Sequence, residues 1–184
     1  MNLYDKNNHF NLANIVTFAN VAFGTMALYF VTQKSFAIAI VLAWIAGGLD
    51  ILDGKIARKY KLSTEFGVQL DSFADFLSFV VMPAFLLFYS LNIDGGFTTL
   101  VVGLVFIYYI ISGLRRLVAF NLKTDAGSVD KFFVGVPTPL GAILLWVLYL
   151  LSHTFGLITS PILIALLVAI IAWSLNSNIK VPHP

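Results

Sequence analysis

Six long apolar stretches follow one another along the chain, and they constrain its fold more than any other feature. They cover roughly Asn11–Val31, Phe36–Asp53, Gly67–Leu91, Phe97–Leu114, Val136–Leu151 and Leu157–Leu175. A helix needs about 20 mostly apolar residues to cross a bilayer. The runs are continuous rather than alternating, which excludes a membrane β-barrel. We therefore expect an all-α, polytopic integral membrane protein with six transmembrane helices, which forms a single domain over residues 1–184.

The composition excludes several other classes of protein. The chain is 59% hydrophobic and 11% charged, whereas soluble domains are about 45–50% apolar and about 25% charged. It contains no cysteine, so a disulfide-stapled secreted module is excluded. A net charge of +2 leaves no basic surface for nucleic acid, and we expect no nucleic-acid partner.

The basic residues predict an orientation in the membrane. They gather after the second stretch and around and after the end of the fourth, at Lys55, Arg58, Lys59, Lys61, Arg115, Arg116, Lys123 and Lys131. The connections after the third and fifth stretches contain no Lys or Arg. Positive charge marks the cytoplasmic side of a membrane protein. We therefore expect both termini in the cytoplasm, in a protein integral to the cytoplasmic (inner) membrane.

Four aspartates lie inside the apolar stretches. Asp50 and Asp53 end the second stretch, and Asp71 and Asp75 lie near the start of the third. Asp53 and Asp71 are each about nine residues from a turn near Leu62, which is roughly 13 Å along each antiparallel helix. Since each pair occupies one helix face, the four carboxylates should converge at one level near the cytoplasmic membrane surface. An intramembrane ionisable group is a candidate functional residue.

Four neighbouring carboxylates need compensation by protons, basic partners or metal ions. A set of oxygen ligands without His or Cys favours Mg²⁺, Mn²⁺ or Ca²⁺. The alternative is a buried ion-pair network that only specifies helix packing, but Arg58 alone cannot balance four acids. Asn14, Thr17 and Asn20 form a polar stripe on the first stretch, which either lines the same site or bonds to a neighbouring helix.

The spacing of these residues resembles a known signature. The pattern D-x2-D-G-x2-A-R-x8-G-x3-D-x3-D of the CDP-alcohol phosphotransferase family is matched at every defined position, by Asp50, Asp53, Gly54, Ala57, Arg58, Gly67, Asp71 and Asp75. Two further segments, Gly113–Asn121 and Phe133–Pro139, are similar to elements of the phosphatidylserine synthase branch of that family. Ala119 departs from the branch, which has an arginine at that position.

The resemblance implies transfer of a phosphatidyl group from CDP-diacylglycerol to the hydroxyl of L-serine, with release of CMP. It implies two divalent metal ions, one held by Asp50, Asp53 and Asp71 and the second by Asp71 and Asp75. Asp75 would also be the catalytic general base, in an active site that faces the cytoplasm.

The resemblance further implies that Gly54, Ala57, Arg58 and Gly67 bind the CDP group. Arg116 and Lys131 are candidates for binding the serine carboxylate or the lipid phosphate. A homodimer in the lipid membrane is expected from the family alone.

Several alternatives stay open on the sequence. The acceptor could be glycerol 3-phosphate, inositol phosphate or choline, and the lipid could be an ether-linked CDP-archaeol. A cation transporter could also place aspartates inside a membrane, although its acids would be spread through the membrane depth and these lie at one level.

Overall fold

The computed structural model describes residues 3–125, 132–177 and 180–182. The regular secondary structure of these residues is helical apart from one short pair of strands, so the predicted helical class is confirmed. The chain divides into two compact units, Met1–Ser78 and Phe79–Pro184, and each is described by itself.

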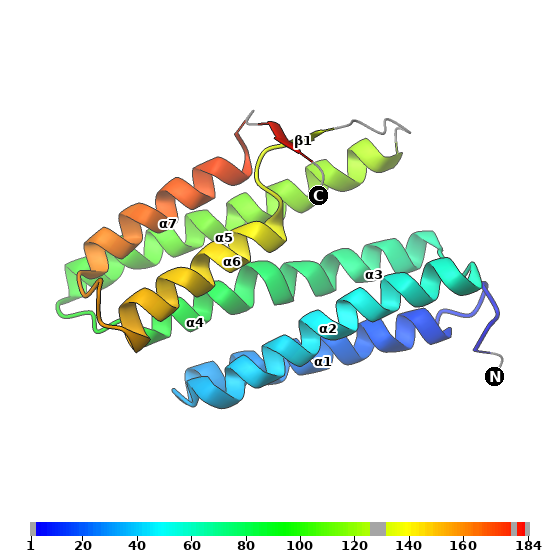
Figure 1. Ribbon diagram of the computed structural model, residues 1–184, viewed down its shortest axis with the longest axis horizontal. Helices are drawn as coiled ribbons and strands as arrows, with labels where there is room; N and C mark the ends of the chain where they lie inside the picture. The colour runs from blue at the N-terminus through cyan, green and yellow to red at the C-terminus, as the bar shows by residue number, and fades with distance from the viewer. Residues whose placement is uncertain (1–2, 126–131, 178–179, 183–184) are drawn as a thin grey trace. The chain divides into compact units, whose positions relative to one another are not determined.

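The first unit holds α1 (Leu12–Thr32), α2 (Phe36–Tyr60) and α3 (Glu65–Asp75), followed by the first residues of the π-helix η1 (Phe76–Val81). Helices α1 and α2 form a closely packed hairpin, and α3 packs against α1 (Figure 1). The buried apolar positions of α1 and α2 are mostly small, such as Ala13, Ala27, Ala39 and Ala46. Small residues let membrane helices approach closely.

Local signals fix the helix ends in this unit. Asn11 caps α1 by accepting a hydrogen bond from the backbone N–H of Asn14 at 3.0 Å. Thr64 caps α3 in the same way through the N–H of Gly67, also at 3.0 Å. Lys61 ends α2 with a left-handed backbone at φ 56°. The turn between α2 and α3 therefore falls at the predicted place.

The second unit contains α4 (Met82–Ser90), α5 (Gly96–Asp125), α6 (Thr138–Tyr149), the π-helix η2 (Leu150–Thr154) and α7 (Pro161–Leu175). Helix α5 packs against α7, and α4 packs against α6 (Figure 1). Strands β1 (Phe132–Val134) and β2 (Lys180–Pro182) pair antiparallel, with Phe133 opposite Val181. The segment before the fifth predicted span therefore meets the C-terminal tail.

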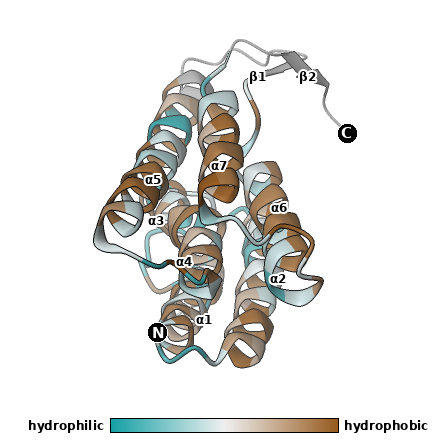
Figure 2. Cartoon of the chain, turned by 90° about the vertical axis from the view of Figure 1, so that its left-hand side faces the viewer, coloured by the Kyte–Doolittle hydropathy of each residue, from teal (hydrophilic) through white to brown (hydrophobic). Residues whose placement is uncertain are grey.

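Among the residues that the structure describes, four helices are long and apolar enough to cross a membrane, namely Leu12–Thr32, Phe36–Tyr60, Glu65–Ser90 and Gly96–Leu122. Thr138–Thr154 and Pro161–Leu175 are shorter apolar helices. Large apolar side chains such as Trp44 and Trp173 lie on exposed surface, and the helices are predominantly hydrophobic (Figure 2). These features indicate a membrane protein, while the count of six spans and the N-in/C-in topology stay predictions.

Some helix boundaries were predicted wrongly. The second helix continues past Asp53 to Tyr60, and the fourth continues past Leu114 to Asp125. The apolar runs end where the basic residues begin, but Lys and Arg are good helix formers, so the helices extend beyond them. The π-helix η1 was not predicted. Pro83, the second residue of α4, lacks the N–H that would bond four residues back, and this favours a distorted turn before it.

Candidate functional site

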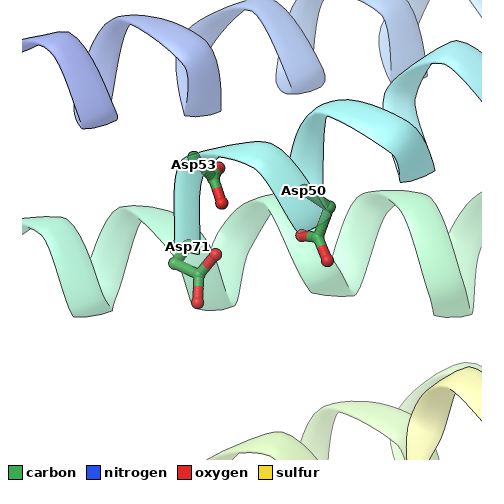
Figure 3. Close-up of side chains that lie close together, drawn as sticks. All are labelled: Asp50, Asp53 and Asp71. Carbon is green, nitrogen blue, oxygen red and sulfur yellow. The ribbon is translucent and has the colours of Figure 1, made fainter. Parts of the chain in front are cut away.

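Three aspartates converge in the first unit. Asp50 and Asp53 project from α2 and Asp71 projects from α3, and one carboxylate oxygen of each lies within 4.8 Å of those of the other two (Figure 3). The i,i+3 spacing places Asp50 and Asp53 on one side of α2. The turn between the helices brings Asp71 to the same level.

The fourth aspartate, Asp75, adjoins this group. It lies one turn beyond Asp71 in α3, and its carboxyl group lies beside the Asp50 carboxyl. All four aspartates of the signature therefore lie near one another in the first unit.

The donor set fits a hard divalent cation. Asp53 is only 3% exposed, and its Oδ2 is buried without a hydrogen-bond partner among the described residues. The Thr17 hydroxyl and the Gly54 backbone N–H lie beside the same carboxylate. Since buried polar atoms are almost always satisfied, the free Oδ2 fits a position that a cation would complete. Carboxylate oxygens are the ligands that Mg²⁺, Mn²⁺ and Ca²⁺ take.

A pocket of about 210 Å³ opens beside Asp53 and Asp71. Its lining includes all four residues that the signature predicts for CDP binding, Gly54, Ala57, Arg58 and Gly67, together with Asn14, Thr17 and Thr64. A methyl group at Gly54 would lie 3.4 Å from Nη1 of Arg58. A methyl group at Gly67 would lie 3.0 Å from Oδ1 of Asn14 and 3.2 Å from Oγ1 of Thr64. At both positions the absence of a side chain therefore allows a polar group to lie close to the backbone of the glycine.

The polar stripe of α1 has both of the roles that the sequence left open, since it lines the site and also bonds to a neighbouring helix. Asn14 and Thr17 line the pocket, whereas Asn20 donates from Nδ2 to Oδ1 of Asp50 at 3.3 Å. Ser78, which sequence reasoning missed, donates its hydroxyl to Oδ1 of Asn20 at 2.9 Å. Ser78 lies seven residues after Asp71 and three after Asp75 on a helical face, a spacing that could have identified it.

Arg116 belongs to the second unit. It is 9% exposed, and its Nη2 donates to the carbonyl oxygen of Gly135 at 3.5 Å. It thereby connects the two segments that resemble the phosphatidylserine synthase branch, while Arg115 beside it is exposed. Lys131 lies outside the described residues.

Gly135 is tightly enclosed near the end of α7. Its φ is +86°, and a methyl group there would lie 2.6 Å from the carbonyl oxygen of Leu175. Asn176 donates from Nδ2 to the carbonyl oxygen of Ser112 at 3.0 Å. Helix α5, the segment before α6 and the end of α7 are therefore connected by hydrogen bonds around Arg116.

Comparison with known proteins assigns the chain to a family. Residues 10–175 match the model of the CDP-alcohol phosphatidyltransferase family, and the protein belongs to that family. The resemblance of the aspartate signature is thus confirmed, and the class is that of a phosphotransferase.

The chain is similar to several curated proteins whose names specify a serine acceptor or product. The CDP-diacylglycerol–serine O-phosphatidyltransferase of Bacillus subtilis is 31% identical over 170 residues, which is 92% of this chain and 88% of the relative. The enzyme of that name from Helicobacter pylori is 27% identical over 173 residues, which is 92% of this chain and 71% of the relative. The archaetidylserine synthase of Methanothermobacter thermautotrophicus is 31% identical over 163 residues, 88% of this chain and 67% of the relative.

Proposed function

We propose that this protein transfers a phosphatidyl group from CDP-diacylglycerol to the hydroxyl of L-serine, forming phosphatidylserine and releasing CMP. The observation that carries the proposal is the convergence of Asp50, Asp53 and Asp71 beside the pocket formed by the remaining signature residues. The printed names of the bacterial relatives support serine as the acceptor.

In this proposal Asp50, Asp53 and Asp71 would hold one divalent cation, and Asp71 and Asp75 would hold a second. Bound divalent cations would neutralise the negative charge on the pyrophosphate and on the departing CMP. The buried and unpartnered Oδ2 of Asp53 supports a ligand role for that residue. Mg²⁺ and Mn²⁺ are the preferred ions, with Ca²⁺ as the alternative.

Asp75 is proposed as the general base. The serine oxygen attacks the phosphorus of the phosphatidyl group, the bond from that phosphorus to the CMP oxygen breaks, and the serine proton passes to the Asp75 carboxylate. The position of Asp75 beside Asp50 and Asp71 supports this role, because a general base must lie within reach of the proton that it takes.

The pocket lined by Gly54, Ala57, Arg58 and Gly67 is proposed to bind the CDP group. The glycines and the alanine leave room for a flat ligand near the backbone. The Arg58 guanidinium over Gly54 would pair with the phosphates, since its planar donors suit phosphate oxygens.

Arg116, and Lys131 outside the described residues, are proposed to bind the serine carboxylate or the lipid phosphate. Arg116 is buried, and its described hydrogen bond goes to a backbone carbonyl rather than to a carboxylate. Its positive charge therefore still needs a negative partner, which supports binding of an anion. The alternative role for both residues is cytoplasmic charge that only fixes topology.

We place the enzyme in the cytoplasmic membrane, with six spans, both termini inside and the active site facing the cytoplasm. The basic residues at the ends of α2 and α5 support this orientation. We propose that the whole chain acts as one catalytic domain. Homodimerisation stays a prediction.

The archaeal relative favours one second candidate, in which the donor is an ether-linked CDP-archaeol and the product is archaetidylserine. An acceptor screen tests the main proposal. Purified protein in detergent with CDP-diacylglycerol and Mg²⁺ or Mn²⁺ is offered serine, glycerol 3-phosphate, inositol 1-phosphate or choline, and CMP release is followed. Release only with serine is expected. Release only with another acceptor would contradict the serine assignment, and no release from CDP-diacylglycerol or CDP-archaeol would favour the transporter alternative.

A further inference from the structure

Asn20 lies between the aspartate site and a third helical segment. Its side chain is fully buried in α1. Its Nδ2 donates to Oδ1 of Asp50 at 3.3 Å, and its Oδ1 accepts from the Ser78 hydroxyl at 2.9 Å. Asn20 therefore connects α1 with Asp50 of α2 on one side and with Ser78 of η1 on the other.

The direction of these hydrogen bonds is fixed by the chemistry of the groups. An ionised carboxylate only accepts, so Asp50 requires the amide NH₂ of Asn20 to face it. The amide oxygen then faces the opposite way and needs a donor, which the Ser78 hydroxyl provides. Ser78 thus holds the amide in the orientation that presents a donor to Asp50.

The packing of the first unit makes this arrangement possible. Gly24 lies one helical turn beyond Asn20 in α1, and a methyl group there would lie 3.1 Å from Cδ2 of Leu77 and 3.4 Å from Oγ of Ser78. The absence of a side chain at Gly24 lets η1 approach α1 closely. Ser78, a residue only 9% exposed, can then reach the Asn20 amide with its hydroxyl group.

Asp50 has a particular need for such a donor. One of its oxygens lies within 4.8 Å of carboxylate oxygens of Asp53 and Asp71, and Asp75 adjoins it as well. Repulsion from these like charges would turn a free carboxylate away from the group. A hydrogen bond to Oδ1 holds the side chain in place, and a carboxylate with one such bond keeps further lone pairs for a cation.

We propose that Asn20 is a positioning residue of the active site, that it orients the Asp50 carboxylate toward a divalent cation, and that Ser78 acts through Asn20. The proposal rests on the proposed function, since it takes Asp50 as a metal ligand. Outer-shell partners of ligating carboxylates commonly change metal affinity about 10–100-fold when they are removed.

The test is a titration of the purified protein in detergent with Mn²⁺ alone, with free Mn²⁺ measured by electron paramagnetic resonance. We expect Asn20→Ala to weaken Mn²⁺ binding about tenfold and Ser78→Ala to weaken it less. The double variant should be no weaker than Asn20→Ala, because Ser78 acts through the amide. The control is Ser90→Ala, whose hydroxyl donates to its own helix at the Leu87 carbonyl, and it should bind Mn²⁺ like the parent.

Unchanged Mn²⁺ affinity in folded Asn20→Ala and Ser78→Ala would overturn the inference and leave the proposed function intact. Losses that simply add in the double variant would also overturn it, since independent effects are additive. If Asn20→Ala fails to fold, the Mn²⁺ affinity of Ser78→Ala, compared with that of Ser90→Ala, decides the question alone. A parent protein that binds no Mn²⁺ would contradict the proposed function, and the inference with it.

Discussion

Oδ1 of Asn14 lies 3.0 Å from the position that a methyl group on Gly67 would occupy. Both residues line the pocket beside Asp53 and Asp71. Any side chain at position 67 would therefore displace the Asn14 amide or the capping hydroxyl of Thr64, which is 3.2 Å from the same position. The pocket depends on this glycine for space.

Gly67→Ala should consequently raise the KM for CDP-diacylglycerol about tenfold, equivalent to about 1.4 kcal/mol, because overfilling a packed site costs about 1–3 kcal/mol. Steady-state CMP release measures this effect. Gly47→Ala is the matched control, since a methyl group there would meet no described atom within 4 Å apart from its chain neighbours and the adjacent backbone of its own helix. An unchanged KM in Gly67→Ala would show that the ligand does not use this part of the pocket.

Asp75→Asn should reduce turnover at least about 100-fold while the protein still folds, because loss of a general base typically costs about 10²–10⁴-fold. The amide has nearly the shape of the carboxyl group and can still bond to Asp50. The rate of CMP release and the elution profile of the purified protein check both parts. Turnover within a few-fold of the parent would remove Asp75 from the role of base.

Removal of divalent cations should stop the reaction reversibly. EDTA should abolish CMP release, and Mg²⁺ or Mn²⁺ in excess should restore it, because three converging carboxylates need compensation of their charge. A rate that is indifferent to EDTA would contradict the assignment of a metal site.

Gly135→Ala should destabilise the second unit by more than about 1–3 kcal/mol, since it combines an unfavourable backbone with a methyl group 2.6 Å from the Leu175 carbonyl oxygen. Gly95→Ala is the matched control, because Gly95 has nearly the same φ, +88°, in open space. Thermal unfolding in detergent compares the two variants. Equal stability losses would mean that the contact with Leu175 has no energetic weight.

The sequence predicted most of the candidate site because the signature residues lie on one helical hairpin. Helical spacing places Asp50 and Asp53 on one face, and equal distances from the turn bring Asp71 to their level. The contact of Asn20 with Asp50 could not be predicted, since it depends on how α1 packs against α2. The polar stripe on α1 indicated an interaction but not its partner.

The predicted fold was less complete at its boundaries. Hydropathy locates apolar segments, but it does not detect that α2 and α5 continue through basic residues to Tyr60 and Asp125. The π-helix η1 depends on backbone geometry around Pro83 that no hydrophobic pattern records.

The most direct test of the central claim is mass spectrometry of the lipid product after incubation with CDP-diacylglycerol and serine labelled with ¹⁸O in its hydroxyl group. Attack by the serine oxygen on phosphorus predicts phosphatidylserine that retains the label, together with unlabelled CMP. Absence of phosphatidylserine, or a product without the label, would contradict the proposed reaction.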